Sequence, residues 1–491
     1  MPRSAPGDPT APATAPPPPA PAPGTTPDTG TAHRTAHHGA HHGAEIAPRP
    51  AATLAVTSAA TSVALMTYTA PAVILPDTAA SLGTSLTAQA WLLNGTPLGL
   101  AAFLLAAGSV ADDHGRRRVF LWGTAGLGVT TALGALAQTT LLFTLARVAQ
   151  GAASAAILAT SLGLLVHAFP AGHGRVRATG IWGACVSGGI AVGPLAAGAI
   201  TAADWRWAYA ALGAASLLVT AFAPRALTES RTPRGGRTDL AGALTLGLAA
   251  TALVAALTLG RDGWLRAPVG ALLLAAVLLT AVFVAVERRA AAPVLDLGLL
   301  RRPLFLASST GALFTGFSVI ALFSYLPALL QHTIGMSAMG AAWLIFLWSG
   351  ASFAVALQAR RLGGRISARH QLALGFALHA VAVLTMLGAV SSGSWPRLLP
   401  GLVISGAGSG LLNAALPLLA VESVPADRAA MGSGAGNTAR YIGSAAGVAL
   451  MIAVATASGD LAHGADVAMA VSAGLAVVAA AGVLLLRERR G

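Results

Sequence analysis

The sequence predicts an all-α polytopic membrane protein, on three observations. First, 55% of the 491 residues are hydrophobic and only 10% are charged, whereas the surface of a water-soluble protein carries about a quarter or more charged residues. Second, apolar stretches long enough to cross a bilayer core of about 30 Å recur along the chain. Third, the basic residues are distributed very unevenly between the segments that connect these stretches.

Fourteen transmembrane helices are predicted, each from one apolar stretch. They are placed at residues 52–76, 91–111, 119–136, 141–169, 177–200, 207–223, 240–259, 267–286, 304–332, 338–357, 371–390, 396–421, 430–457 and 467–486. The preceding residues, 1–50, are rich in Pro, Ala, Gly, Thr and His and could not bury a core, so they are predicted to form a disordered tail. The tail contains a histidine cluster, but low-complexity sequence also produces such clusters, and we expect no metal site and no cofactor.

All 30 basic residues are arginine. Of these, 24 fall in the tail, in the connections after even-numbered spans and at the C-terminus, while only four fall on the opposite side. Cytoplasmic segments of membrane proteins are enriched in basic residues, so both termini are predicted to lie in the cytoplasm. The net charge of +13 is therefore a topology signal, and we expect a lipid bilayer, not nucleic acid, as the surroundings of this chain.

An internal repeat is visible in the spacing of landmark glycines. Pairs separated by 252 to 255 residues are Gly123 and Gly375, Gly151 and Gly406, and Gly193 and Gly447. If spans one to six correspond to spans nine to fourteen, residues 51–224 form one six-helix bundle and residues 304–491 form another in the same orientation. Residues 225–303 are then a linker with two inserted helices. Such paired bundles place a binding site at mid-membrane, between halves that rock.

Two arginines fall inside predicted spans, where a charged side chain costs about 2.5 to 3.5 kcal/mol and normally faces a bundle interior or an aqueous cavity. Arg440 shares one helical face with Asn437 and Tyr441, and Arg147 is followed one turn later by Gln150. We expect these residues to bind a ligand or to couple its movement to an ion. The other candidate polar groups of the cavity are Asn94, Asn413 and Tyr325.

Several motifs occur in order along the chain. Residues 108–118 read GSVADDHGRRR, which resembles the loop motif of the major facilitator superfamily, Gly-x-Leu-Ala-Asp-x-x-Gly-Arg-Arg-Arg. Residues 147–151 read RVAQG and resemble its Arg-x-x-Gln-Gly motif. Residues 189–198 read GIAVGPLAAG and resemble the antiporter signature of drug exporters, except for Ala197 in place of a glycine. With WRW at 205–207, PVLDL at 293–297 and fourteen spans, the chain resembles the fourteen-span drug:proton antiporter branch of that superfamily.

The resemblance implies a major facilitator fold of two six-helix bundles plus two inserted helices, and it implies moving parts. Asp112 and Arg116 are expected to lock the inner ends of the bundles in one state. Gly108 and Gly115 belong to the same motif, and Gly115 permits the tight reversal of the chain. The candidate bending segment of span five, which combines small residues with a helix-breaking proline, consists of Gly189, Gly193 and Pro194.

One departure from the branch concerns the acid usually found in span one. Here residues 66–76 read MTYTAPAVILP, so Thr67 stands where that acid is common. None of the spans has a carboxylate at its centre, whereas two have an arginine, which favours an anionic or neutral organic substrate. His379 in span eleven could titrate near neutral pH, although a lone membrane histidine is more often a hydrogen-bonding residue between packed helices.

The predicted function is export of a small organic compound, a drug or antibiotic, across a bacterial cell membrane by alternating access, with inward proton movement implied by the resemblance. We expect small-molecule and proton partners and a monomer. An importer or facilitator is the rival hypothesis within transport. A transporter-like sensor and a membrane enzyme are rival hypotheses outside transport, and neither a nucleophile-base pair nor a metal-ligand helix motif supports an enzyme.

Overall fold

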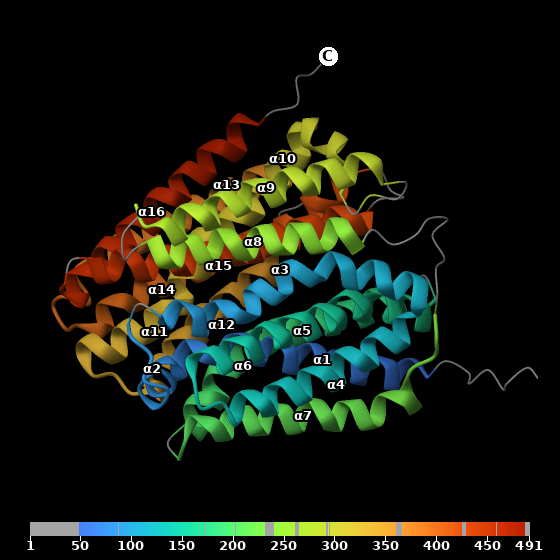
Figure 1. The fold of residues 1–491 in the computed structure, drawn as a ribbon, viewed down its shortest axis with the longest axis horizontal. Coiled ribbons are helices and arrows are strands. Elements are labelled where there is room, and N and C mark those ends of the chain that lie inside the picture. The colour runs from blue at the N-terminus through green and yellow to red at the C-terminus, as the bar shows by residue number, and fades with distance from the viewer. Residues whose placement is uncertain are drawn as a thin grey trace, which may run out of the picture. The chain divides into compact units, whose positions relative to one another are not determined.

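The computed structural model describes residues 49–486, except 87, 171, 202, 231–239, 261–264, 291, 292, 294, 360–365, 425–428 and 458. For residues 109, 112, 113, 176, 240, 421, 429 and 430 it describes the backbone alone. The tail predicted at residues 1–50 lies outside the described residues, apart from its last two. Throughout the described ranges the regular secondary structure is helical, with no strand, which confirms the predicted fold class (Figure 1).

The helices follow one another with short connections. The first half contains α1 (Pro50–Thr69), α2 (Pro71–Ser81), α3 (Gln89–His114), α4 (Arg116–Ala135), α5 (Thr140–Ala168), α6 (His173–Ile200) and α7 (Trp205–Ala226). The inserted pair is α8 (Leu240–Gly260) and α9 (Ala267–Arg289). The second half contains η1 (Leu297–Arg301), α10 (Pro303–Phe314), η2 (Thr315–Ile320), α11 (Ala321–Ile334), α12 (Ala338–Ala359), α13 (Ala368–Met386), η3 (Trp395–Arg397), α14 (Leu398–Glu422), α15 (Ala429–Ala457) and α16 (Leu461–Leu485).

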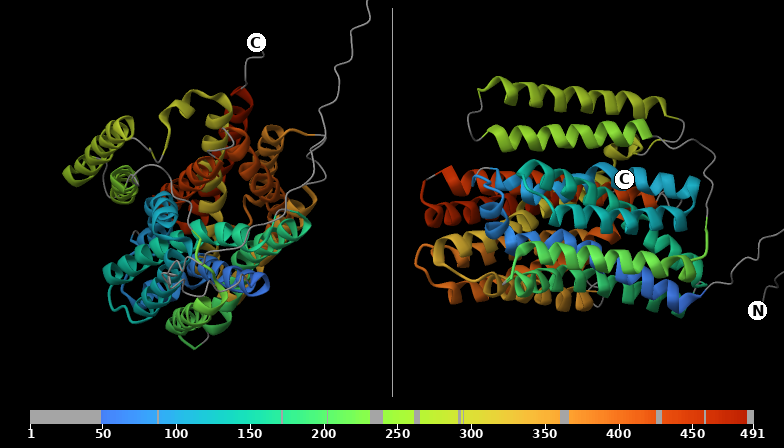
Figure 2. Two further views of the ribbon diagram at one scale, coloured as in Figure 1. Left: turned by 90° about the vertical axis from the view of Figure 1, so that its right-hand side faces the viewer. Right: turned by 60° about the horizontal axis from the view of Figure 1, so that its bottom comes forward.

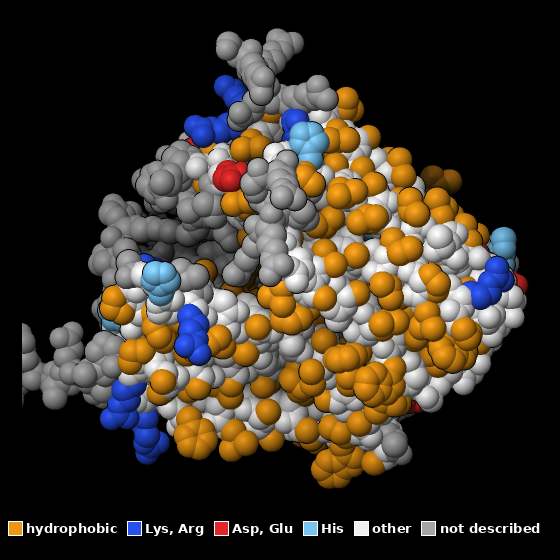
Figure 3. Space-filling view, turned by 180° about the vertical axis from the view of Figure 1, so that it is seen from behind, with side chains coloured by type: hydrophobic (Ala, Val, Ile, Leu, Met, Phe, Trp, Pro, Cys, Tyr) orange, Lys and Arg blue, Asp and Glu red, His pale blue; other side chains and the backbone are white. Residues whose placement is uncertain are grey.

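Each predicted span coincides with a helix or a run of consecutive helices. Twelve helical segments of the described residues are long and apolar enough to cross a membrane. The helices α4 and α13 coincide with predicted spans three and eleven but are not among these twelve, so a count of fourteen stays a prediction. Hydrophobic side chains cover the middle of the face in Figure 3, and arginines lie toward its edges, as a belt of lipid around the protein requires.

Two predicted spans are interrupted, and only the first interruption has a sequence signal, because a proline cannot donate the helical hydrogen bond. Span one consists of α1 and α2, which meet at Ala70 and Pro71. Span nine consists of α10, the π-helical segment η2 and α11. A π-helical turn inside a longer helix frequently lies at a functional position.

The two halves repeat the same packing pattern. In the first half α1 pairs with α6, α3 with α5, and α4 with both α5 and α7; in the second, α10 and η2 pair with α15, α12 with α14, and α13 with both α14 and α16. The repeated glycines lie at equivalent contacts. A Cβ added to Gly151 of α5 would lie 2.7 Å from Gly99 Cα in α3, and one added to Gly406 of α14 would lie 2.5 Å from the Trp348 carbonyl oxygen in α12. This equivalence supports two bundles, whose boundaries at residues 224 and 303 stay predictions.

The inserted helices lie on the side of this arrangement. Helix α8 packs against α3 and α15, so it covers the seam at which these helices from different halves meet. A Cβ added to Gly247 of α8 would lie 2.7 Å from Ala102 Cα, which shows how closely α8 approaches α3. Helix α9 packs against α8 and lies outermost (Figure 2).

The halves also meet through α6 with α12 and through α2 with α11. The side-chain nitrogen of Gln331 in α11 donates to the carbonyl of Val73 in α2 at 2.8 Å, and a Cβ added to Gly198 in α6 would lie 3.3 Å from the carbonyl oxygen of Ala338 in α12. Toward the other ends of α6 and α12, a Cβ added to Gly183 or Gly350 would meet no atom within 4 Å. The two helices are therefore in close contact where α6 ends and α12 begins.

Candidate ligand cavity

A small cavity of about 50 Å³ lies between α10, α14 and α15 in the second half. Apolar and polar side chains both face it, and none of the lining residues is acidic. The lining residues are Ser308, Ala312, Asn413, Leu416, Pro417, Ala420, Ser433, Gly436, Asn437 and Arg440. A mixed lining of this kind offers contacts to both the apolar and the polar groups of an organic molecule.

Arg440 supplies the one charged side chain of this lining. Its Nη2 donates to Asn437 Oδ1 at 3.0 Å, and its guanidinium carbon lies 5.3 Å from the centre of the Tyr441 ring. Its Nε is buried and has no hydrogen-bond partner in the described part of the chain. A positive charge that no carboxylate neutralises thus faces the cavity, where it would attract an anion or a strong hydrogen-bond acceptor.

Amide groups and one missing helical hydrogen bond add further hydrogen-bonding capacity. Asn437 Nδ2 donates to the Ser433 carbonyl at 3.1 Å, which orients its oxygen toward the guanidinium. Asn413 Nδ2 lies 3.4 Å from Ser352 Oγ. Pro417 has no N–H, so the carbonyl of Asn413, one turn earlier, lacks its usual helical donor. The cavity therefore combines a cation with amides and a backbone acceptor.

The predicted polar stripe of α15 divides between two surroundings. Asn437 and Arg440 face the cavity, whereas Tyr441 and Ser444 face the first half. The ring centroids of Tyr68 in α1 and Tyr441 are 5.8 Å apart in an edge-on arrangement, and the Tyr68 hydroxyl lies 3.2 Å from Ser444 Oγ. The cation is thus next to a polar contact between the halves.

Arg147 is completely buried and does not line the cavity. Its Nη1 donates to the Thr67 carbonyl at 2.7 Å and to Gln150 Oε1 at 3.1 Å. Thr67 precedes Pro71 by one helical turn, and Pro71 lacks the N–H that would otherwise bond to that carbonyl. Arg147 therefore satisfies the acceptor that the break between α1 and α2 exposes. This geometry favours a structural role for Arg147 and Gln150 over contact with a ligand.

Asn94 and Tyr325 also lie away from the cavity. Both are almost completely buried. The Asn94 amide has no hydrogen-bond partner among the described residues, and Tyr325 belongs to the main apolar cluster of the core. Of the eight residues predicted to bind or couple, the structure brings Asn413, Asn437 and Arg440 to the cavity.

The arginine-rich turn between α3 and α4 is held by a glutamate that sequence reasoning missed. Gly115 has a φ of 106°, which glycine tolerates and other residues rarely adopt. A Cβ there would lie 2.5 Å from Glu229 Oε1. The same oxygen accepts the backbone N–H of Arg117 at 3.0 Å, and Oε2 lies 3.9 Å from Arg118 Nε. The carboxylate thus sits at the positive N-terminus of α4, among its first arginines.

The other predicted residues of this turn are placed as follows. A Cβ added to Gly163 of α5 would lie 2.8 Å from Arg116 Nε, so the Arg116 side chain packs against α5. A Cβ added to Gly108 would meet no atom within 4 Å. The Asp112 side chain lies outside the described residues, and its lock with Arg116 stays a prediction. One signal for Glu229 was available, because it is the first carboxylate after span six and follows that span on the arginine-rich side.

The small residues of α6 pack that helix tightly on α1. A Cβ added to Gly189 would lie 2.7 Å from the Ser62 carbonyl oxygen, and one added to Gly193 would lie 2.8 Å from Met66 Cα. Helix α6 runs without interruption from His173 to Ile200, through Pro194. Close packing is what small residues at helical spacing provide, while bending at Pro194 stays a prediction.

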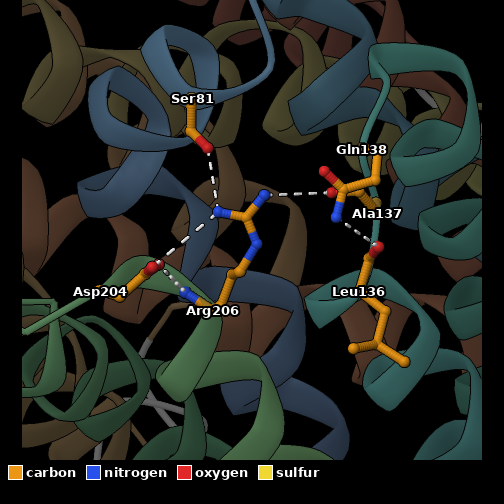
Figure 4. Close-up of polar contacts among 6 residues, drawn as sticks. All are labelled: Ser81, Leu136, Ala137, Gln138, Asp204 and Arg206. Carbon is orange, nitrogen blue, oxygen red and sulfur yellow. Dashed lines mark hydrogen bonds and ion pairs between the residues drawn. The ribbon is translucent and has the colours of Figure 1, made fainter.

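The motif at residues 205–207 organises one end of the first half (Figure 4). Arg206 Nη1 donates to Ser81 Oγ at 3.0 Å and Nη2 donates to the Ala137 carbonyl at 3.3 Å. Its backbone N–H donates to Asp204 Oδ1 at 2.8 Å, and its guanidinium lies 4.5 Å from the centre of the Trp205 ring. One side chain thereby ties together the end of α2, the turn after α4 and the start of α7.

The motif at residues 293–297 connects the inserted helices to α15. Asp296 Oδ1 accepts the backbone N–H of Gly298 at 2.8 Å, which caps the short helix η1. The backbone N–H of Asp296 lies 3.4 Å from the sulfur of Met431 in α15. The motif therefore has a structural explanation at the start of the second half.

Comparison with known proteins shows the family of this chain and several similar proteins. The family described as "Major Facilitator Superfamily" matches residues 57–448. The chain is 32% identical over 391 residues to "Multidrug resistance protein Stp" of Mycobacterium tuberculosis, a match that covers 78% of this chain and 72% of the relative. It is also 32% identical over 432 residues to "Puromycin resistance protein pur8" of Streptomyces alboniger, covering 84% of this chain and 85% of the relative.

Among solved structures, the fold is similar to that of a bacterial homologue of the human lysosomal transporter Spinster, in an inward-facing and occupied conformation. The TM-score is 0.63, the sequence identity is 16%, and the match covers 89% of this chain and 98% of the other. At this identity the likeness concerns the fold alone. It agrees with the helix pairing of the two halves.

Proposed function

Because the chain belongs to the major facilitator superfamily, we propose that it is a secondary active exporter that moves a small organic compound out of a bacterial cell by alternating access. The protein is a membrane transporter and not an enzyme. Relatives named for multidrug and puromycin resistance support a drug or antibiotic as the cargo. Both are bacterial proteins, which supports the bacterial cell membrane as its location.

The observation that carries the proposal is the uncompensated charge of Arg440 beside a cavity with no acidic lining residue. An anionic compound would gain a charge-assisted hydrogen bond there, and a neutral one would gain a bond to a carbonyl or hydroxyl oxygen. A permanent cation would meet like charge. The cargo is therefore an anionic or neutral organic compound, held by Arg440 with Asn437 and Asn413.

The side of the membrane from which the cargo enters is proposed from the topology and the helix packing together. The arginine distribution supports cytoplasmic N- and C-termini, so that the ends of α6 and α12 that touch at Gly198 and Ala338 are external. Gly183 and Gly350 would then lie on the cytoplasmic side of this contact, and a Cβ added to either would meet no atom within 4 Å. This arrangement suits a state that is shut outside and takes its cargo from the cytoplasm.

The moving parts are proposed from the motifs that resemble those of the superfamily. The turn at Gly115 and Arg116, with Gly108 and Asp112, would change its contacts as the inner ends close. The α6 segment at Gly189, Gly193 and Pro194 would slide or bend against α1. Protons moving inward would drive the cycle, and the single chain, which contains both bundles, would act as a monomer.

Efflux from cells tests the proposal directly. A strain lacking the protein and a strain expressing it are compared for sensitivity to a panel of antibiotics and to the anionic dye fluorescein, with and without a protonophore. Export predicts lower accumulation in the expressing strain, abolished by the protonophore and by Arg440→Ala, with the variant still inserted in the membrane. Accumulation that rises on expression would instead indicate an importer. Normal efflux by a well-expressed Arg440→Ala variant would remove the site assignment.

A further inference from the structure

The second half contains a buried network around His379 that the proposed function does not use. His379 lies in the middle of α13 and is completely buried. Its Nδ1 lies 2.8 Å from Ser405 Oγ in α14, and its Nε2 lies 3.1 Å from Ser472 Oγ in α16. Ser318 Oγ in η2 donates to the Ser472 carbonyl at 2.9 Å, and Ser472 Oγ donates to the Ser318 carbonyl at 3.2 Å. One imidazole therefore joins four helical elements.

The donors and acceptors of this network fit one protonation state. The Ser472 hydroxyl has a single proton, which goes to the Ser318 carbonyl, so its oxygen accepts the proton on His379 Nε2. The Trp348 Nε1–H, which can only donate, bonds to Ser405 Oγ at 3.2 Å. The Ser405 hydroxyl proton is then directed at Nδ1. A neutral imidazole protonated on Nε2 satisfies every partner.

A second proton, added at Nδ1, would turn that atom from an acceptor into a donor. The Ser405 hydroxyl would have to rotate away, because its oxygen would receive two N–H groups. Phe323 and Trp348 cover the ring on the side of α11 and α12, and no acidic or basic side chain of the described residues bonds to it. The ionisable groups of α14 and α16 stand near helix ends; they are Arg397, Glu422, His463 and Asp466. An imidazolium is therefore unfavourable in this packing and favours a different one.

The π-helical segment η2 connects this network to the cavity. A Cβ added to Gly316 would overlap the carbonyl oxygen of Arg440, so the backbones of η2 and α15 are in direct contact at the cavity's cation. Ser318, two residues later, belongs to the His379 network. This close backbone contact gives a direct route by which a rearrangement at one site displaces the other, because packed interiors transmit strain.

We propose that His379 is the proton-binding site that couples inward proton movement to export of the compound bound at Arg440, an inference that rests on the proposed function. Imidazole is the side chain that ordinarily gains and loses a proton between about pH 5 and 8. Every other histidine of the described residues stands within three residues of a helix end, and span one has Thr67 in place of an acid.

The protonation state agrees with the order of events in antiport. The neutral network belongs to the state that is shut outside and takes cargo from the cytoplasm. In that state the proton has already left His379. In the outward-open state a proton from outside adds to the lone pair of Nδ1, and the Ser405 hydroxyl turns away. Return to the inward state releases that proton to the cytoplasm and restores the bond from Ser405 to Nδ1.

His379→Gln tests the coupling in proteoliposomes of phosphatidylethanolamine and phosphatidylglycerol. The probe is the panel compound that the wild-type protein exports fastest. The variant is expected to keep binding and one-for-one exchange of the compound across the membrane at equal pH, and to lose accumulation driven by a pH gradient. His332→Gln, at an exposed histidine near the end of α11, is the matched control and should keep both activities. Gradient-driven accumulation by His379→Gln at the wild-type level would overturn the proposal.

Two further measurements cover the case in which His379→Gln does not fold. Potentiometric titration of the purified wild-type protein needs no variant and should show that the compound's binding releases protons. Ser405→Ala removes the hydroxyl that competes for Nδ1, so its pH profile of transport should shift to higher pH. Binding without proton release, together with an unshifted Ser405→Ala profile, would overturn the proposal. Arg440→Ala tests the proposed function separately, because it should lose both binding and exchange. A failure of the proposed function is therefore distinguishable from a failure of the coupling proposal.

Discussion

Replacement of Arg440 by alanine gives the sharpest consequence of the cavity's geometry. The guanidinium is oriented by Asn437 at 3.0 Å and by the Tyr441 ring, and among the described residues it has no carboxylate partner to be left uncompensated. The variant therefore loses a bond to the cargo without exposing a buried negative charge. A hydrogen bond that involves a charged group contributes about 1.5 to 3 kcal/mol, which corresponds to a loss of affinity of roughly 10- to 150-fold.

The assay is equilibrium binding of the exported compound to purified protein in lipid nanodiscs. Arg440→Lys keeps the charge but not the planar fork, so its affinity should fall between those of wild type and Arg440→Ala. Arg397→Ala, at an exposed arginine that bonds to Ser392 at 3.4 Å, is the matched control and should bind normally. Wild-type affinity in a folded Arg440→Ala protein would refute the assignment of this cavity.

The remaining predictions concern packing. Gly115→Ala should lower the unfolding free energy by about 1 to 3 kcal/mol, because it combines an unfavourable φ with a Cβ that meets the Glu229 carboxylate; a thermal melt in detergent measures this. Gly443→Ala would push a Cβ into the Leu313 carbonyl oxygen and should cost about 1 to 3 kcal/mol by the same melt. Arg206→Gln removes bonds to two neighbouring segments and should increase proteolysis of the connections at that end of the first half.

A control variant and a contradicting outcome are available for the two glycine predictions. Gly474→Ala lies in a helix where an added Cβ meets no atom within 4 Å, so it should leave the melting temperature unchanged or raise it. An equal loss in Gly443→Ala and Gly474→Ala would contradict the close contact of α15 with α10. An unchanged melt of Gly115→Ala would contradict the placement of Glu229.

The sequence was most informative where placing a residue in the membrane or in water has a large energetic cost. Apolar length located the helices, and the cost of burying a cation singled out Arg440, which indeed faces a cavity. The same cost singled out Arg147, but a single sequence cannot tell whether a buried cation meets a cavity or a free backbone carbonyl. The carbonyl in question depends on Pro71, and the contact joins residues 80 positions apart.

Other features have little or no local sequence signal. The π-helical segment η2 contains no proline, and its backbone packs closely on Gly443 and Gly447 of α15. Glu229 has only a weak signal, its position after span six on the arginine-rich side, and its contacts became visible when the residues after α7 were placed beside the start of α4. Tertiary contacts of this kind decide which of several plausible polar residues form a site, and they are absent from composition and periodicity.

The most direct test of the central claim is an experimental structure of the protein with an exported compound bound. The account predicts an anionic or neutral compound between α10, α14 and α15, with an oxygen within hydrogen-bond distance of the Arg440 guanidinium and an amide of Asn413 or Asn437. A permanent cation in that cavity, or a compound bound elsewhere with Arg440 turned toward lipid, would contradict it.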